Sequence, residues 1–225
     1  MYQFNASIKL LSFDLDNALY DNRATIEAAE LSCQNYLQSA FSNQGVHFEY
    51  EKFWEIRKQL VAQNNPAFDD LTYLRLTVLI EFCKPLNAGE TIAKQALAAF
   101  LQQRSKVDVE PTIQSMLSLL VKHFTLVSTS NGNCDINQTI IAPFFSKNYF
   151  PVGGMRAKPH PAMLHQCMAD FSITASQLVH IGDSIEKDGG VAEAIGARYL
   201  HFAPFESDKD LAQSCHELCL QLSSL

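Results

Sequence analysis

Short apolar runs and amphipathic stretches alternate along most of the chain. Residues 8–13 form the first apolar run, which ends at an acidic cluster and predicts a buried β-strand with a polar C-terminal end. Beyond residue 110 the pattern predicts further strands at 124–128, 148–152, 178–181 and 198–202. Between and after them it predicts helices at 111–123, 135–141, 161–170, 191–195 and 209–222. This alternation indicates an α/β fold, with a parallel sheet covered by helices on both faces.

Residues 25–106 have a different pattern. Apolar side chains recur there at the helical period in four groups, and no stretch between them has convincing strand character. We therefore expect four helices that form a module of their own. Because this module follows the first strand and precedes the second, it is predicted to be an insertion into the sheet-forming part of the chain.

Composition and charge narrow the possible functions. The chain has 225 residues, 47% of them hydrophobic, and its 17 basic and 24 acidic side chains give a formal net charge of −7. This balance argues against binding to nucleic acid or to an anionic membrane, and it favours a metal ion or a small ligand. No apolar run reaches the roughly 18 residues of a membrane span, and the first residues lack the features of a secretory signal. The six cysteines form no CxxC pair, so we expect reduced thiols in a cytoplasmic protein.

Four segments that follow predicted strands are unusually polar. Ligands of parallel α/β sheets bind at the carboxyl ends of the strands, so these segments form the candidate site. They are Asp14-Leu15-Asp16-Asn17, Ser130-Asn131-Gly132, Arg156-Ala157-Lys158-Pro159 and Gly182-Asp183 through Asp188. Two close carboxylates need a cation or a shared proton, and oxygen-only acidic clusters suit Mg²⁺ better than zinc or copper. Each segment alone also has an ordinary explanation: a solvated turn, a helix cap or, for Lys158, a surface lysine.

The order of these four segments resembles the haloacid dehalogenase-like hydrolase superfamily, and within it the bacterial phosphatases of flavin mononucleotide and the related riboflavin-pathway ester. The resemblance covers the whole chain. It implies a Rossmann-like, three-layer catalytic core at residues 1–18 and 111–225, and an all-helical cap at 19–110. It also implies a Mg²⁺-dependent phosphatase that acts on a small phosphorylated metabolite through an aspartyl-phosphate, as a monomer or homodimer.

The resemblance assigns a role to each candidate residue. Asp14 is the expected nucleophile, and Asp16 the expected general acid and base. The other expected roles are phosphate binding by Ser130, Asn131 and Lys158, Mg²⁺ binding by Asp14, the Asp16 carbonyl and Asp183, and support of Lys158 or a metal-bound water by Asp188. Ala18 departs from the family, which usually has Thr there, so a loosened loop with lower activity is an open alternative.

Two other functions are compatible with the same residues. The protein could be a phosphomutase, or a catalytically weak relative that binds a phosphorylated ligand. A dehalogenase is disfavoured, because displacement of a halide needs neither a proton on the leaving group nor a metal. Asp16 and the acidic fourth segment would then have no task.

Histidines and aromatic residues are weaker candidates. The seven histidines show no metal-binding spacing, and His180 is expected to be a hydrogen-bonded core residue. Tyr50, Phe53, Trp54 and Tyr73 could line a pocket of the helical module, although aromatic residues at helical spacing belong more often to a core.

Overall fold

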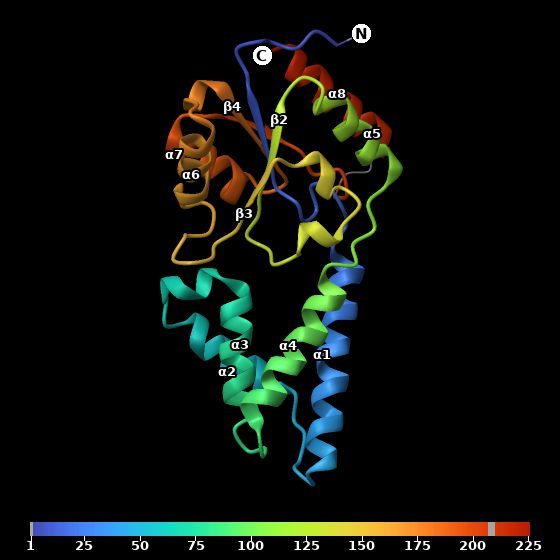
Figure 1. Cartoon of the computed structure of the whole chain (residues 1–225), viewed down its shortest axis with the longest axis vertical. Helices are drawn as coiled ribbons and strands as arrows, with labels where there is room; N and C mark the ends of the chain where they lie inside the picture. Colours follow the sequence, from blue (N-terminus) through green and yellow to red (C-terminus); the bar gives the residue numbers. More distant parts are fainter. Residues whose placement is uncertain (1, 207–209) are drawn as a thin grey trace. The chain divides into compact units, whose positions relative to one another are not determined.

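The computed structural model describes residues 2–206 and 210–225, which fall into two compact units (Figure 1). The first, the α/β unit, contains the described residues of Met1–Asn22, Val107–Gly132 and Ile136–Leu225. The second, the helical unit, contains Arg23–Lys106 and Asn133–Asp135.

The α/β unit is built on one parallel sheet of five strands in the order β3-β2-β1-β4-β5. The strands are β1 Leu10–Phe13, β2 Thr125–Thr129, β3 Lys147–Tyr149, β4 Leu178–Gly182 and β5 Arg198–His201. The central strand β1 and its neighbour β4 are buried at every position, as expected for strands covered on both faces. This architecture confirms the predicted α/β fold class.

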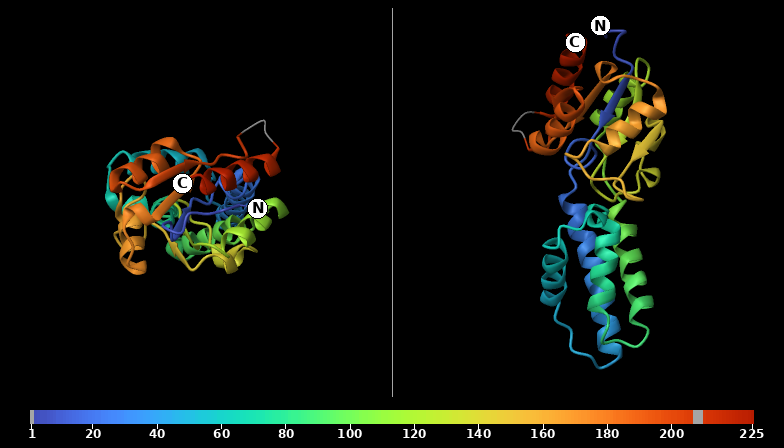
Figure 2. Two further views of the ribbon diagram at one scale, coloured as in Figure 1. Left: turned by 90° about the horizontal axis from the view of Figure 1, so that it is seen from above. Right: turned by 90° about the vertical axis from the view of Figure 1, so that its left-hand side faces the viewer.

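Helices cover both faces of this sheet and complete three layers. On one face lie α6 Ala162–Phe171 and α7 Gly190–Ile195, and on the other α5 Pro111–Leu120 and α8 Leu211–Ser223 (Figure 1, Figure 2). Under α6 and α7, side chains of the three central strands pack against the helices, among them Leu10, Val127 and Leu178. Every second residue of these strands therefore points into this layer of the core.

Several predicted boundaries differ from the structure. The helix expected at 135–141 is instead two short 3₁₀ turns, Ile136–Gln138 and Ala142–Phe144. Thr139 donates hydrogen bonds to the Ile136 carbonyl from both its backbone N–H (2.9 Å) and its hydroxyl (2.7 Å). Pro143 follows shortly after, so the pattern of α-helical hydrogen bonds does not continue. The third strand ends at Tyr149 rather than 152. The start of the last helix, expected at Lys209, lies outside the described residues.

The helical unit consists of long helices around an aromatic core. They are α1 Arg23–Asn43, α2 Glu51–Val61, α3 Leu71–Phe82 and α4 Gly89–Arg104, with a 3₁₀ turn at Pro66–Asp69 before α3. Asp70 caps α3, because its carboxylate accepts hydrogen bonds from the backbone N–H groups of Thr72 and Tyr73 at 2.9 and 3.0 Å. Residues 23–106, all of them described, contain no strand.

Two further features follow from the described residues. All six cysteines are buried and carry free thiols. None of the helices in these ranges combines the length and the apolar character that crossing a membrane would demand.

Candidate active site

Three of the predicted site residues follow directly on neighbouring strands. Asp14 comes after β1, Ser130 after β2 and Asp183 after β4. The register pairs Phe13 with Ser128 on one side and with Ile181 on the other, so the three strands end at nearly the same level. The Asp14 backbone N–H extends the pairing by donating to the Ile181 carbonyl at 2.8 Å. The parallel sheet thus brings these side chains to one edge.

Lys158 reaches this edge from the segment that leads into α6. Its ammonium group donates to Asp14 Oδ1 at 2.8 Å and to Asp188 Oδ1 at 2.5 Å, and the residue is only 4% exposed. The alternative of a surface lysine is therefore wrong. Asn131 fixes the backbone of Lys158, since its amide accepts from the Lys158 N–H at 2.7 Å and donates to the Lys158 carbonyl at 2.8 Å.

Asp188 lies in the π-helical turn Ile185–Gly189, and its carboxylate has three hydrogen-bond partners. Besides Lys158, His180 Nε2 lies 3.0 Å from Asp188 Oδ1, and the Ser184 N–H donates to Asp188 Oδ2 at 3.0 Å. Gly182 makes this packing feasible, because a Cβ at that position would lie 2.3 Å from Asp188 Cγ. The glycine of the fourth polar segment is thus required by close approach of Asp188.

The site gathers more negative charge than positive charge. Carboxylate oxygens of Asp14, Asp183 and Asp188 lie within 4.8 Å of one another, next to the single ammonium of Lys158. Burial and the charges of Asp14 and Asp188 raise the pKa of Asp183 to about 7. Burial likewise raises the pKa of Asp14, although Lys158 opposes this effect.

Asp188 and Lys158 are stabilised in their charged forms. Burial alone would raise the pKa of Asp188, but the hydrogen bond from His180 and the charge of Lys158 outweigh it and hold that pKa well below its ordinary value. Burial alone would lower the pKa of Lys158, but Asp14 and Asp188 outweigh it and raise that pKa. An oxygen-only set with surplus negative charge fits a hard divalent cation such as Mg²⁺.

Asp16 and Ser130 lie at the same edge but outside this carboxylate group. Asp16 is half-buried and belongs to a turn in which Asn17 adopts a left-handed conformation, with φ of 60°. The backbone closes this turn: the Asn17 N–H donates to the Tyr20 carbonyl, and the Leu19 N–H to the Leu15 carbonyl. The turn therefore forms with Ala18 in place of Thr. Ser130 is 1% exposed, and its hydroxyl accepts from the Gly132 N–H at 3.1 Å.

The sequence does not predict which partners Asn131 and His180 have. Asn131 was expected at the phosphate, whereas its side chain is engaged with the Lys158 backbone. His180 is fully buried and hydrogen-bonded, as expected of a core residue, yet one of its partners is Asp188. The available signal was a polar residue inside an apolar strand shortly before an acidic strand end, a pattern that Ser12 shares.

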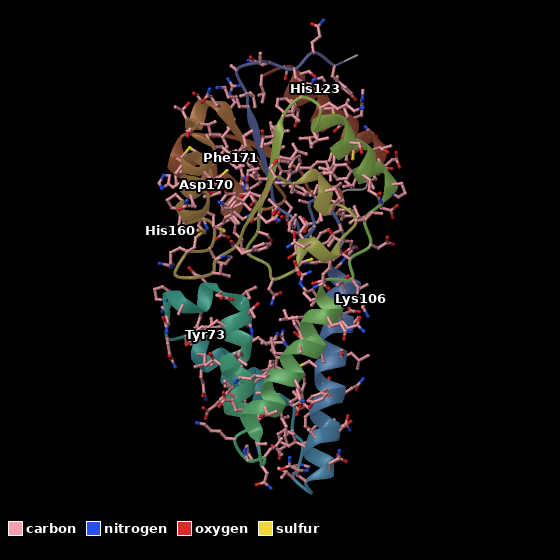
Figure 3. The ribbon with its side chains drawn as sticks, in the orientation of Figure 1. Tyr73, Lys106, His123, His160, Asp170 and Phe171 are labelled. Atoms are coloured by element: carbon pink, nitrogen blue, oxygen red, sulfur yellow. The ribbon has the colours of Figure 1, made fainter. Side chains whose placement is uncertain are left out.

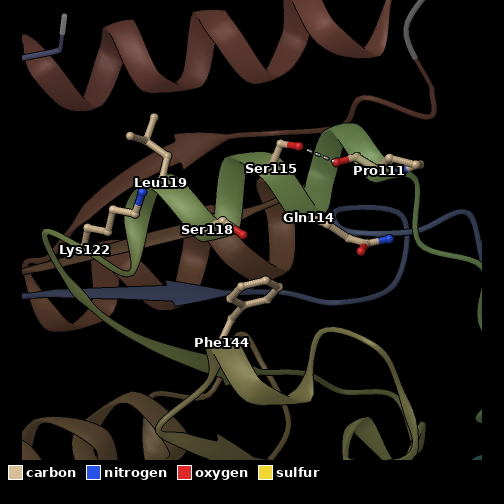
Figure 4. Close-up of a pocket in the computed structure, with 7 residues that line it drawn as sticks. All are labelled: Pro111, Gln114, Ser115, Ser118, Leu119, Lys122 and Phe144. Atoms are coloured by element: carbon tan, nitrogen blue, oxygen red, sulfur yellow. Dashed lines mark hydrogen bonds between the residues drawn. The ribbon is translucent and has the colours of Figure 1, made fainter.

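Other surfaces of the two units are less suited to this chemistry. A hollow of about 480 Å³ runs along α5 in the α/β unit, lined by Ser115, Ser118, Lys122 and Phe144 among others, and none of the predicted site residues lies in it (Figure 4). In the helical unit Phe53 is fully buried in the core, whereas Trp54 and Tyr73 are 44% and 49% exposed. Figure 3 labels Tyr73. Only these last two aromatic candidates present much of their rings at the surface of that unit.

The chain is also similar to known hydrolases. A family model described as haloacid dehalogenase-like hydrolase matches residues 8–196. The 5-amino-6-(5-phospho-D-ribitylamino)uracil phosphatase YigB of Escherichia coli is 25% identical, over 89% of this chain and 86% of its own. A phosphoglycolate phosphatase of Colwellia psychrerythraea is 33% identical, over 78% and 76% of the two chains. The crystal structure of a 2-haloacid dehalogenase from Pseudomonas syringae superposes with a TM-score of 0.82 at 28% identity, and covers 94% of this chain and 98% of that one.

Proposed function

Because the chain belongs to the haloacid dehalogenase-like hydrolase family, we propose that it hydrolyses a small phosphate monoester with Asp14 as the nucleophile. The observation that carries this proposal is the buried Lys158, which lies between Asp14 and Asp188 at the edge of the sheet. A fixed ammonium beside the attacking carboxylate supplies positive charge where the phosphoryl oxygens must lie. The phosphatases among its relatives support the same reaction class.

The reaction proceeds in two displacements at phosphorus. A carboxylate oxygen of Asp14 forms a bond to phosphorus while the bond to the ester oxygen breaks, and Asp16 gives its proton to the departing alcohol. Asp16 then takes a proton from a water molecule, whose oxygen displaces Asp14 and releases inorganic phosphate. Lys158 and Ser130 hold the phosphoryl oxygens, and Asn131 keeps Lys158 in place.

The carboxylates of this chain suit a magnesium ion. Asp14, Asp183 and the backbone carbonyl of Asp16 would hold it. The raised pKa of Asp183 supports such a role because, besides burial, the nearby carboxylates of Asp14 and Asp188 raise it. When bound, Mg²⁺ supplies the charge that allows an anionic carboxylate to approach an anionic phosphate. Asp188 holds Lys158 by accepting a second hydrogen bond from its ammonium group.

The two parts of the chain have separate tasks in this proposal. The α/β unit is the catalytic core, and the helical unit is a cap that recognises the remainder of the substrate. Trp54 and Tyr73 are the aromatic side chains that a flat ring could stack on. Flavin mononucleotide, or a related ring-bearing ester such as that named for the Escherichia coli relative, is therefore the proposed substrate. The six buried free thiols support a reducing compartment such as the cytoplasm.

Turnover of an aryl phosphate by the purified chain, with Mg²⁺ and with EDTA, tests the reaction class. We expect release of phosphate that EDTA abolishes. The likeness to the Pseudomonas syringae protein makes dehalogenation the second candidate, so chloride release from 2-chloropropionate is measured in parallel. Chloride release without phosphate release would reject the phosphatase and support the second candidate.

A substrate panel tests the finer assignment. It contains flavin mononucleotide, 5-amino-6-(5-phospho-D-ribitylamino)uracil and phosphoglycolate, each scored by kcat/KM. We expect the two ring-bearing esters to be hydrolysed more efficiently than phosphoglycolate. Replacing Trp54 and Tyr73 by Ala should lower kcat/KM for the ring-bearing esters alone. A preference for phosphoglycolate would reject the ring-bearing substrate while leaving the reaction class intact.

A further inference from the structure

Three polar residues interrupt the apolar layer beneath α6 and α7. Leu10, Val127 and Leu178 belong to this layer, and two residues further along the same strands are Ser12, Thr129 and His180. Because side chains alternate between the faces of a sheet, these three point to the same face as the apolar residues before them. All three are fully buried. A layer of apolar side chains thus gives way to polar ones as the strands approach the candidate site.

Hydrogen bonds join these residues into one continuous chain that ends at Lys158. Thr129 Oγ1 lies 2.6 Å from Ser12 Oγ, and Ser12 Oγ lies 3.0 Å from His180 Nδ1. On the other side of the ring, His180 Nε2 lies 3.0 Å from Asp188 Oδ1, the same oxygen that accepts from the Lys158 ammonium. The chain crosses from β2 through β1 to β4, which are adjacent strands.

Elementary chemistry determines which group donates in each of these hydrogen bonds. An ionised carboxylate only accepts hydrogen bonds, so the proton on the imidazole is at Nε2. Burial lowers the pKa of His180, which keeps the ring neutral and leaves Nδ1 as an acceptor. The Ser12 hydroxyl must then donate to Nδ1, and the Thr129 hydroxyl must donate to Ser12. Every donor in the chain therefore points toward Asp188.

We propose that His180 is a positioning residue for the reaction, and that Ser12 and Thr129 orient its ring. The proposal rests on the phosphatase function above, because the ammonium of Lys158 must be held where the phosphoryl oxygens lie. Asp188 Oδ2 is held by the Ser184 N–H, and His180 is the second group that fixes the rotation of this carboxylate. Without the imidazole donor, Oδ1 is free to follow the lysine, and the ammonium is no longer fixed relative to Asp14.

The opposite face of the sheet offers a matched control. Ser128 precedes Thr129 on β2, is equally buried, and donates to Asn148 Oδ1 at 2.8 Å. It points away from the layer that contains Ser12 and His180, because it is one residue out of phase. Ser128→Ala therefore removes a buried, hydrogen-bonded hydroxyl of the same sheet without touching the chain to Asp188.

Steady-state kinetics of four single variants test the proposal. We expect His180→Leu to lower kcat by about 10- to 100-fold with little change in KM, since the partners of groups at a reaction centre have effects of this size. His180→Gln, whose amide can donate from nearly the same position, should recover most of the lost kcat. Ser12→Ala should lower kcat less than His180→Leu does, and Ser128→Ala should leave kcat unchanged.

The double variant Ser12→Ala/His180→Leu separates this role from a merely structural one. If Ser12 acts through the ring, the double variant loses no more kcat than His180→Leu alone. Independent, additive losses would overturn the proposal. So would a loss of kcat in Ser128→Ala equal to that in Ser12→Ala, because the effect would then come from disturbing the sheet.

A measurement without substrate keeps the test independent of the proposed function. The ¹⁵N chemical shifts of the imidazole of His180, assigned by the signal lost in His180→Gln, report which ring nitrogen carries the proton. We expect a neutral ring with the proton at Nε2 in the wild-type protein. A proton at Nδ1, or at both nitrogens, would overturn the orientation of the chain. Absence of phosphatase activity with the expected shifts would instead reject the proposed function alone.

Discussion

Each of the two units contains an ion pair removed from most solvent, and the two pairs differ in their balance of charge. In the helical unit the Arg75 guanidinium donates to both carboxylate oxygens of Glu30, and the Tyr50 hydroxyl donates to the same carboxylate. The guanidinium carbon lies 3.6 Å from the centre of the Phe100 ring. One cation faces one anion, and the surrounding aromatic groups complete the packing.

In the α/β unit a single ammonium faces several carboxylates. Lys158 pairs with Asp14 and Asp188, and Asp183 adds a third carboxylate to the group. Burial raises the pKa of Asp183, and the charges of Asp14 and Asp188 raise it further, whereas Glu30 faces the single charge of Arg75. In a balanced pair, removing one partner leaves the other charge uncompensated and destabilises the fold, while an unbalanced group of carboxylates is suited to a cation. The two units should therefore respond in opposite ways when a carboxylate is neutralised.

The largest effect is expected for Asp14→Asn. An amide cannot serve as the attacking oxygen anion, so phosphatase activity should be abolished and no phosphoryl-enzyme should be trapped after reaction with an aryl phosphate. The Tm of the metal-free protein should not fall, because one of several mutually repelling charges is removed and Lys158 keeps Asp188. Asp108→Asn, at an exposed position, is the control. Near wild-type turnover by Asp14→Asn would reject the nucleophile.

Asp183→Asn should act on the metal instead of the nucleophile. We expect a sharply raised Mg²⁺ requirement, measured as the Mg²⁺ concentration for half-maximal activity. Because Asp183 has a pKa of about 7 and binds a cation only when ionised, Mg²⁺ affinity of the wild-type protein should rise as pH increases through 7. Calorimetric titration between pH 6 and 8 measures this rise, and a pH-independent affinity would show that Asp183 is not a ligand.

The sequence predicted the fold better than the connections within the site. The sheet could be predicted because apolar strands and polar strand ends are local patterns, and 135–141 was mistaken for a helix because local hydrogen bonds of Thr139 compete with the helical ladder. The predicted site residues could be named, but the burial of Lys158 and its position between two carboxylates depend on tertiary packing. The sequence predicts a buried His180, whereas its contact with Asp188 depends on the course of the backbone from β4 into the following turn.

Glu30→Gln should produce the opposite outcome to Asp14→Asn. It leaves the Arg75 charge without its partner in a largely apolar environment, so the free energy of unfolding should fall. Breaking a fully buried pair costs about 3–5 kcal/mol. Because the two side chains are 12% and 21% exposed, we expect roughly 1–3 kcal/mol. Denaturant titration measures the change, with Glu27→Gln on the exposed face of α1 as the control. Loss of kcat without loss of stability would assign this pair to function.

The smallest effect is expected for an ion pair at the surface, because water solvates both charges there and the pair contributes little to stability. Asp170 lies at the end of α6 (Figure 3). It accepts from Lys147 Nζ at 2.6 Å and from the Tyr149 hydroxyl at 2.7 Å, and these hydrogen bonds lower its pKa from 3.8 to about 2. Because the folded pKa is depressed, the contribution to stability is present above pH 4 and is lost as pH falls toward 2.

Thermal unfolding of Asp170→Asn against the wild-type protein measures this contribution. The side chain of Lys147 is 49% exposed, so we expect the variant to lower Tm by no more than about 2–4 °C at pH 7. The difference between the two proteins should shrink as pH falls from 4 through 2, because Asp170 is then protonated first in the unfolded and finally in the folded state of the wild type. A difference that stays the same from pH 4 to pH 2 would mean that packing around Tyr149, and not the charge of Asp170, is what the substitution disturbs.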